Sequence, residues 1–329
     1  MMISIIVPTR NRPKELAVAL ASIRRQSYDL LEIVVVDDAS TENCKAENIS
    51  VIADIDKTIR YFELPPTNGR SHGVGFARNF GVRHSSGDII GFCDDDDFWL
   101  NSQHLGVTVK YFAENSDVDV VYGNQITAFE GKIISRVWQP EFLENIKEKL
   151  RDVSGFVRLT KGECLFSSER FPHLNVSLYR RQLFEQIGGF SEHLTYYQDL
   201  DFFLRAMDRA SGVAYLDMDV ATHNRPNRAL SGNLSSDLGS LQRVLWDVDV
   251  TRSLAYRCGD PDVIDYARRL TSTYLRDLAL LYRKDGEIGK ARQAARSALA
   301  WRFSFRWFAY TCWLGMVSKN GLSAATTER

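Results

Sequence analysis

The chain contains 329 residues, of which 25% are charged, and its formal net charge is -1. This length is sufficient for one large domain and an accessory segment. The balanced charge, without a long basic run before the C-terminal region, argues against a general nucleic-acid binder. The five cysteines are scattered and never form a Cys-x-x-Cys pair. This usage suggests neither a disulfide framework nor a thiolate zinc site, and it is typical of a reducing cytosol.

The N-terminal residues 1–8 are predicted to form a first strand rather than to direct export. They have no basic lead, and their apolar run is too short for a signal peptide. No apolar stretch in the chain approaches the roughly 18 residues that a transmembrane helix needs. The sequence therefore predicts a cytoplasmic protein that is soluble or attached peripherally to a membrane.

The first hundred residues alternate between strand and helix patterns. The strand patterns are continuous Ile/Val runs, as expected for parallel strands that are covered on both faces. Apolar residues recur at helical spacing between them. This alternation predicts a nucleotide-binding βαβ half. The expected strands are residues 3–7, 31–36, 59–64 and 88–93, and the expected helices are residues 13–25 and 76–84.

From residue 99 to about residue 225 the pattern is mixed. An irregular stretch that ends near residue 170 is typical of loops that cover a substrate. Around it we expect strands at residues 118–122, 133–138, 175–179 and 213–222, and helices at residues 103–113, 180–187 and 199–209.

The composition is helical from about residue 236 to the end. Residues 275–284 and 288–300 flank the turn Asp285-Gly286 and resemble one tetratricopeptide-type hairpin, without a repeat at a fixed period. A last helix over residues 301–313 is aromatic nearly all round and carries Arg302 and Arg306. Two interpretations stay open for it: a cap packed on the hairpin, or a helix that contacts an anionic membrane surface.

Four consecutive aspartates, Asp94 to Asp97, follow the apolar run at residues 88–93. Because crowded like charges raise one another's pKa, such a cluster requires a positive counter-charge. Oxygen ligands favour Mg2+ or Mn2+, which fill their remaining positions with water and substrate phosphates. The cluster thus indicates a metal and a phosphate-bearing substrate at a strand end. The alternative is a solvated loop or a helix N-terminus.

A second acidic pair, Asp37 and Asp38, ends the strand expected at residues 31–36. A carboxylate in that place can accept a hydrogen bond from a base N–H or a ribose hydroxyl, and the alternative is a turn or helix cap. No phosphate-binding P-loop occurs, and the turn at residues 8–12 contains no glycine. A dinucleotide dehydrogenase is therefore disfavoured.

Six motifs, taken in order, resemble the family 2 glycosyltransferases over residues 3–225. The resemblance implies an α/β GT-A fold with a mostly parallel central sheet, a nucleotide-sugar donor, a divalent ion at a DXD motif and inversion at the anomeric carbon. The motifs are Ser4-Ile-Ile-Val-Pro-Thr-Arg-Asn-Arg12, Ile33-Val-Val-Val-Asp-Asp-Ala-Ser40, Ala77-Arg-Asn-Phe-Gly81, Ser86-Gly-Asp-Ile-Ile-Gly-Phe-Cys-Asp-Asp-Asp-Asp-Phe-Trp99, Ile187-Gly-Gly-Phe190 and Gln198-Asp-Leu-Asp-Phe-Phe-Leu-Arg205.

The resemblance also implies roles on the donor side. Asp38 matches the residue that reads the base, and Pro8 and Thr9 line the same pocket. Arg78 matches an arginine that helps to hold the donor.

The DXD motif overlays Asp94, Asp95 and Asp96. Asp94 is expected to face the ribose and a metal-bound water, and Asp96 to ligate Mn2+ or Mg2+ directly. Asp97 is expected to support the acceptor side or the loop. His223 follows the last predicted strand, where many relatives place a histidine that completes the metal site.

Asp199 matches the acidic residue that acts as general base on the acceptor hydroxyl. Gln198 replaces the glutamate that usually precedes this aspartate. This departure puts in doubt the negative charge that would support Asp199 from the neighbouring position. Arg205 is expected to be a structural partner for a carboxylate.

The family resemblance suggests a UDP-sugar donor and a glycan or lipid-linked saccharide acceptor, used in the cytoplasm or at the inner face of the cell membrane. Residues 1–98 would bind the donor, residues 99–230 would hold the acceptor and the catalytic base, and residues 236–329 would form the helical region. Two rivals remain. A sugar nucleotidyltransferase should carry a basic, glycine-rich loop after the first strand, and a non-catalytic carbohydrate-binding or scaffold protein should lack the intact acidic set.

Overall fold

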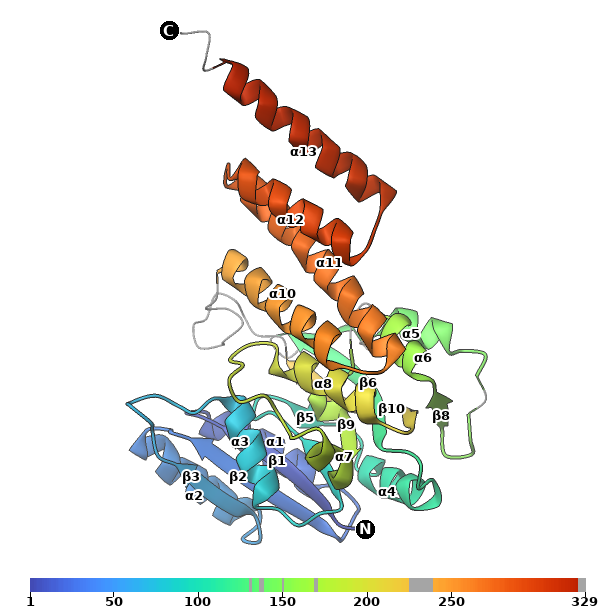
Figure 1. Ribbon diagram of the computed structural model, residues 1–329. Coiled ribbons are helices and arrows are strands. Elements are labelled where there is room, and N and C mark those ends of the chain that lie inside the picture. Colours follow the sequence, from blue (N-terminus) through green and yellow to red (C-terminus); the bar gives the residue numbers. More distant parts are fainter. Residues whose placement is uncertain (130–131, 136–138, 150, 169–170, 225–238, 325–329) are drawn as a thin grey trace. The chain divides into compact units, whose positions relative to one another are not determined.

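The computed structural model of the chain is shown in Figure 1. It describes all residues except 130–131, 136–138, 150, 169–170, 225–238 and 325–329, and for residues 317–324 it describes the backbone alone. The chain divides into two compact units, Met1–Leu230 and Ser231–Arg329, and each is described by itself. The boundary predicted between residues 230 and 236 falls outside the described residues.

The first unit is built on one central sheet. Its order is β3 (Arg60–Leu64), β2 (Leu31–Asp38), β1 (Ile3–Thr9), β4 (Ile89–Phe92), β9 (Ser177–Arg180), β6 (Val120–Phe129), β10 (Val213–Asn224) and β5 (Phe98–Trp99); β7 (Lys132–Ser135) pairs with β6, and β8 (Phe156–Leu159) pairs with β10. Strands β3, β2, β1, β4, β6 and β10 run in one direction, and β9 lies antiparallel between β4 and β6. The prediction of a mostly parallel sheet is confirmed.

Five helices of the first unit were expected from the sequence: α1 (Pro13–Arg24), α3 (Val74–Arg83), α4 (His104–Glu114), α7 (Arg181–Gln186) and α8 (Gln198–Arg209). Three were not. Helix α2 (Glu42–Ile55) buries only Asn48 and Ile52 and so has little apolar periodicity. Helices α5 (Pro140–Asn145) and α6 (Lys161–Phe166) are six residues each and lie in the stretch that was expected to be irregular.

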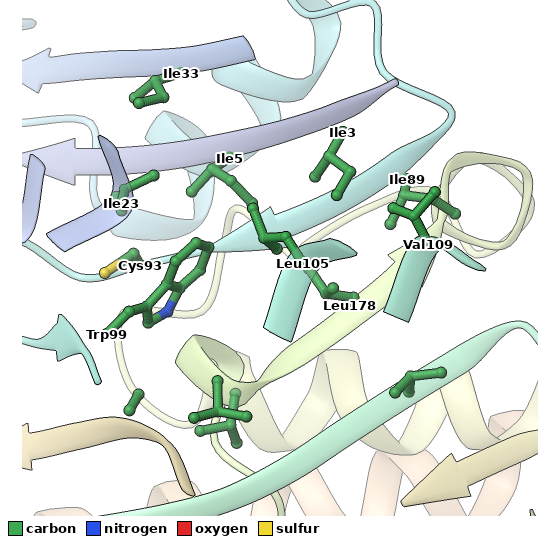
Figure 2. Close-up of a cluster of buried hydrophobic side chains, with 14 of the residues drawn as sticks. Ile3, Ile5, Ile23, Ile33, Ile89, Cys93, Trp99, Leu105, Val109 and Leu178 are labelled. Atoms are coloured by element: carbon green, nitrogen blue, oxygen red, sulfur yellow. The ribbon is translucent and has the colours of Figure 1, made fainter. Parts of the chain in front are cut away.

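Both faces of the sheet are buried, which explains the continuous apolar runs. On one face, Ile5 belongs to a core cluster that also contains Ile23 of α1 and Leu105 of α4 (Figure 2). On the other face, Ile6 lies so close to Gly81 of α3 that a Cβ on the glycine would come within 2.4 Å of it. A glycine at residue 81 therefore lets α3 pack closely on the sheet.

The second unit is helical, as expected. It consists of α10 (Ser240–Arg257), α11 (Pro261–Lys284), α12 (Ile288–Trp301) and α13 (Phe305–Ala324). Alanines on α11 and α12 are fully buried, and Gly286 turns the chain between these helices with a φ of 79°. Among the described residues, no helix is both long enough and apolar enough to cross a membrane.

A buried acid in this unit predicts a pH-dependent stability. Asp247 of α10 is 8% exposed, and its Oδ1 has no hydrogen-bond partner among the described residues. Burial raises the pKa of Asp247 to about 7, with Arg243 opposing the rise and Asp277 adding to it. The folded state therefore binds an extra proton between about pH 4 and pH 7, so this group makes stability fall as the pH rises through that window.

Replacing Asp247 with asparagine should remove this dependence. Relative to the wild type, the variant should gain at least about 1 kcal/mol in free energy of unfolding between pH 5 and pH 8, because one unit of pKa corresponds to ~1.4 kcal/mol. Guanidinium denaturation at the two pH values measures the difference. Parallel pH profiles for the two proteins would contradict this assignment.

Candidate active site

Three parallel neighbours bring the acidic residues to one edge of the sheet. Strand β1 ends at Thr9, β2 ends at Asp38, and β4 leads directly into Asp94. Because β2, β1 and β4 are parallel and adjacent, their carboxyl ends lie side by side. This edge is where open α/β sheets bind ligands.

Basic and hydroxyl side chains hold the first three aspartates of the cluster. The Arg78 Nη2 lies 2.5 Å from the Asp94 carboxylate. The Asp95 carboxylate accepts hydrogen bonds from the Thr9 hydroxyl at 2.8 Å and from Arg12 Nη1 at 3.2 Å. The same Arg12 nitrogen lies 2.7 Å from Asp96 Oδ2.

The crowding changes the protonation of these carboxyl groups. Burial, with the charge of Asp96, raises the pKa of Asp95 to about 7. Burial, with the charges of Asp97 and Asp94, raises the pKa of Asp96 to about 6. Burial also opposes the charge of Asp94, but Arg78 outweighs it and lowers the pKa of that carboxyl. An added cation would stabilise the fully charged cluster.

The fourth aspartate, Asp97, meets two histidines from distant parts of the chain. His223 Nδ1 lies 3.4 Å from Asp97 Oδ1, and His173 Nδ1 lies 3.9 Å from Asp97 Oδ2. One ligand atom from each residue can be chosen so that all three lie within 4.8 Å of one another. Asn175 donates a hydrogen bond of 2.6 Å to Asp97 Oδ2 and so fixes this carboxylate.

This group of Asp97, His173 and His223 fits a divalent cation. The Nδ1 of His173 is buried and has no hydrogen-bond partner within the described part of the chain, although it faces the Asp97 carboxylate. An imidazole nitrogen in that state is available to a metal, and a mixed set of imidazole and carboxylate ligands suits Mn2+. The predicted ligand His223 belongs to the group. Asp96, the other predicted ligand, contacts Arg12 instead, and its ligation stays a prediction.

At the end of β2 the two aspartates differ in their contacts. Asp37 is fully buried and accepts hydrogen bonds from the backbone of Ser40 and from the side chains of Asn48 and Tyr61. Its role is structural. Asp38 accepts two backbone N–H bonds of 2.8 Å, from the residues at positions 72 and 73. Base recognition by Asp38, with the buried Pro8 beside it in β1, stays a prediction.

The two acids of α8 are also distinguished by their surroundings. Asp201 is fully buried and accepts hydrogen bonds from Ser191 Oγ at 2.6 Å and from Arg205 Nη2 at 2.7 Å. Arg205 is thus a structural partner for a carboxylate, as expected. Asp199 lies in the first turn of α8 and is partly exposed. Burial raises the pKa of the Tyr179 hydroxyl, and the negative charge of Asp199 adds to this rise, so the Asp199 carboxylate lies near this buried side chain of β9.

The buried pair between Asp201 and Arg205 predicts a large loss of stability on mutation. Replacing Asp201 with alanine leaves a mostly buried guanidinium without its carboxylate, which should cost about 3–5 kcal/mol. Chemical denaturation of the variant and the wild type measures the change. A loss below about 1 kcal/mol would show that Asp201 does not stabilise the fold through this pair.

Three contacts of the site were not expected from the sequence. His173 lies just before the strand expected at residues 175–179, and Asn175 is its first residue, more than seventy residues from Asp97; no local signal identifies either as a contact of the site. Arg12 had a weak signal, since it is a basic residue in the first βα turn of a fold with an acidic cluster. Asn79 has a structural role: it exchanges two hydrogen bonds with the backbone of Phe190 and so joins the motif at residues 77–81 to the motif at residues 187–190.

Solved structures with the same architecture identify the fold. The S. aureus TarS fragment 1–349, solved in complex with UDP-GlcNAc, superposes with a TM-score of 0.66 over 91% of this chain and 82% of that chain, at 20% identity. The mannosyltransferase PcManGT from Pyrobaculum calidifontis, solved with GDP-Man and Mn2+, gives a TM-score of 0.56 over 99% and 88% of the two chains, at 19% identity. The first unit has the GT-A fold of glycosyltransferases.

The sequence comparisons identify the family. The model of glycosyl transferase family 2 matches residues 4–188, which is more than half of the chain, and the chain belongs to this family. A glycosyltransferase of Haemophilus influenzae is 23% identical over 292 residues, covering 83% of this chain and 88% of that protein. The Escherichia coli UDP-Glc:alpha-D-GlcNAc-diphosphoundecaprenol beta-1,3-glucosyltransferase WfgD is 27% identical over 178 residues, which cover 54% of this chain and 67% of WfgD. The chain is thus a nucleotide-sugar glycosyltransferase.

Proposed function

We propose that this enzyme transfers a sugar from a UDP-sugar to a hydroxyl of a glycan or lipid-linked saccharide, with inversion at the anomeric carbon, in the synthesis of surface polysaccharide or glycoconjugate. The observation that carries the proposal is the group of Asp97, His173 and His223 beside three further buried or half-buried aspartates at the ligand-binding edge of a GT-A sheet.

The donor would occupy the edge formed by β1, β2 and β4, within residues 1–98. Asp38 and the neighbouring Pro8 and Thr9 would contact the uracil. The aspartates at positions 94 and 95 would contact the ribose side of the donor, and the first of them would also face a metal-bound water. The surroundings of Arg78 support a role in binding phosphate, because Arg78 is 3% exposed and its Nε and Nη1 have no hydrogen-bond partner among the residues that the structure describes. A buried guanidinium with unpaired N–H groups is suited to a diphosphate oxygen.

A divalent cation, Mn2+ or Mg2+, fits the described donor set. His173, His223 and Asp97 would hold it, and Asp96 is the further carboxylate that the sequence predicts. When bound, the ion would neutralise charge on the diphosphate. Asn175 would keep the Asp97 carboxylate in place, since its side-chain amide already donates to that group at 2.6 Å.

Asp199 would act as the general base, within residues 99–230. Its carboxylate takes the proton from the acceptor hydroxyl as that oxygen bonds to the anomeric carbon and the bond to the nucleoside diphosphate breaks. Attack from the face opposite the leaving group inverts the anomeric configuration. The partial exposure of Asp199 supports this role over Asp201, whose carboxylate is buried and already paired with Arg205.

A lipid-linked acceptor would place the enzyme at the inner face of the cell membrane. Similarity to WfgD, which by its name glucosylates a diphosphoundecaprenol-linked sugar, supports this acceptor class. The donor proposal is tested by thermal shift with UDP and GDP, each with and without Mn2+. A ligand that binds only the folded state raises Tm by mass action, so UDP with Mn2+ should give the largest rise. A larger rise with GDP would overturn the choice of UDP.

A further inference from the structure

Helix α13 has an outward face that is almost entirely apolar. Its exposed residues include Phe305 and Phe308, and then Trp313 and Met316 further along the helix. Phe305 is 83% exposed. These positions recur at helical spacing, so they form one stripe. A helix surface in contact with water is normally polar, and this stripe therefore indicates a binding surface.

The inward face of α13 is already fixed to its own unit. Leu314 is fully buried, and the Trp307 indole N–H donates a hydrogen bond of 3.1 Å to the backbone oxygen of Ala295 in α12. Helix α13 thus caps the α11–α12 hairpin, as one of the two sequence interpretations expected. Its outward face is not needed for that packing.

Three phenylalanines gather at the start of the exposed face. The Phe303 ring lies 5.0 Å from the Phe305 ring and 6.0 Å from the Phe308 ring, measured between centroids. All three side chains are exposed. We call Phe303, Phe305 and Phe308 the phenylalanine cluster. A compact cluster of exposed rings at the start of a helix, with Phe303 just before it and the other two in α13, is suited to insertion into a soft apolar layer.

The charge around the cluster selects the partner. From Ile288 to Ala324 the sequence has no acidic residue, and its basic residues are Lys290, Arg292, Arg296, Arg302, Arg306 and Lys319. Arg306 is exposed beside the cluster. The guanidinium carbon of Arg283 in α11 lies 4.7 Å from the centre of the Trp313 ring in α13. Arg302 is paired with Asp265 and Lys290 with Glu287, but basic residues remain in excess. Two copies of a surface with this excess of positive charge would repel each other, which disfavours a symmetric dimer through this face. An anionic surface is attracted.

We propose that the outward face of α13 docks on an anionic phospholipid bilayer. The phenylalanine cluster enters the boundary between headgroups and acyl chains, while Arg306 and the neighbouring basic residues contact lipid phosphates. The helix lies in the plane of the surface. This inference does not rest on the sugar-transfer site, because none of its residues belongs to the first unit.

The test is sedimentation of the full-length protein with vesicles of phosphatidylcholine alone or mixed with phosphatidylglycerol. The wild type should sediment with the mixed vesicles at low salt and be released at high salt. The triple variant Phe303→Ser, Phe305→Ser and Phe308→Ser should bind at least about tenfold more weakly. Arg306→Ala should bind about fivefold more weakly to the anionic vesicles, since one basic residue near the surface contributes ~1 kcal/mol.

A matched control replaces three exposed apolar residues of the first unit, Val18, Ile49 and Val153, with serine. This variant should sediment like the wild type, and circular dichroism should show that all variants are folded. The proposal is overturned if the wild type never sediments with anionic vesicles, or if the triple variant sediments as well as the wild type. A dimer seen by sedimentation velocity and lost in the triple variant, without vesicle binding, would assign the face to self-association instead.

Discussion

Replacing Asp199 with asparagine is expected to reduce sugar transfer by at least about 10²-fold, the usual cost of losing a general base. The fold should be retained, because the Asp199 Oδ1 accepts a hydrogen bond of 2.8 Å from the Leu200 N–H and an asparagine oxygen can do the same. Donor affinity should also persist, since the proposed donor contacts come from other elements. Product formation with a fixed acceptor and calorimetric titration of the donor measure the two effects.

A matched control for Asp199 is Asp262→Asn in the first turn of α11. This variant removes the same charge from the same place in a helix, outside the site. It should transfer sugar at the wild-type rate. If Asp199→Asn kept a near-normal rate, the base would have to be sought elsewhere, and burial of Asp201 would make that residue a poor substitute.

Loss of His223 is expected to produce the second large effect. His223 belongs both to the group with Asp97 and His173 and to the ligand set predicted from the sequence. The variant His223→Ala should lower the affinity for Mn2+ in the presence of UDP by at least about 100-fold, because loss of a ligand should cost at least as much as loss of its supporting contacts. Titration calorimetry measures this affinity. His84→Ala, which removes an exposed histidine just after α3, is the control.

The adjacent carboxylates can then be ranked. Asp97→Asn should weaken Mn2+ binding more than Asp96→Asn, because Asp97 contacts both histidines, whereas Asp96 contacts Arg12. The reverse order would restore Asp96 as the main carboxylate ligand. Unchanged affinity in His223→Ala would refute a metal site at this group.

The sheet could be predicted because its strands are covered on both faces. Runs such as residues 33–36 are apolar throughout, and only a buried parallel strand requires this. Helix α2 could not be predicted, since its buried face includes Asn48, which bonds to Asp37. Strand β5 is two residues long, and α5 and α6 are six residues each. Elements this short leave no apolar periodicity to recognise, and the only local signal for α6 among the described residues is the capping box of Thr160 and Glu163.

The site could be predicted where its residues follow strands directly. Asp38 and the four aspartates after β4 have this property, and parallel topology brings them to one edge. The contact between His173 and Asp97 could not be predicted. His173 precedes β9, which enters the sheet antiparallel between β4 and β6. Nor does the motif Gln198-Asp-Leu-Asp201 say which aspartate is paired inside the protein. Burial and the contact with Arg205 decide this for Asp201.

The most direct test of the proposed activity is release of nucleoside diphosphate from a panel of UDP- and GDP-sugars, with Mn2+ or with a chelator. At least one UDP-sugar should be turned over with Mn2+, turnover should stop with the chelator, and Asp199→Asn should lower it. Turnover that is equal with Mn2+ and with the chelator would contradict the proposed metal site. A purified, folded protein that neither binds nor cleaves any sugar nucleotide in either condition would contradict the central claim.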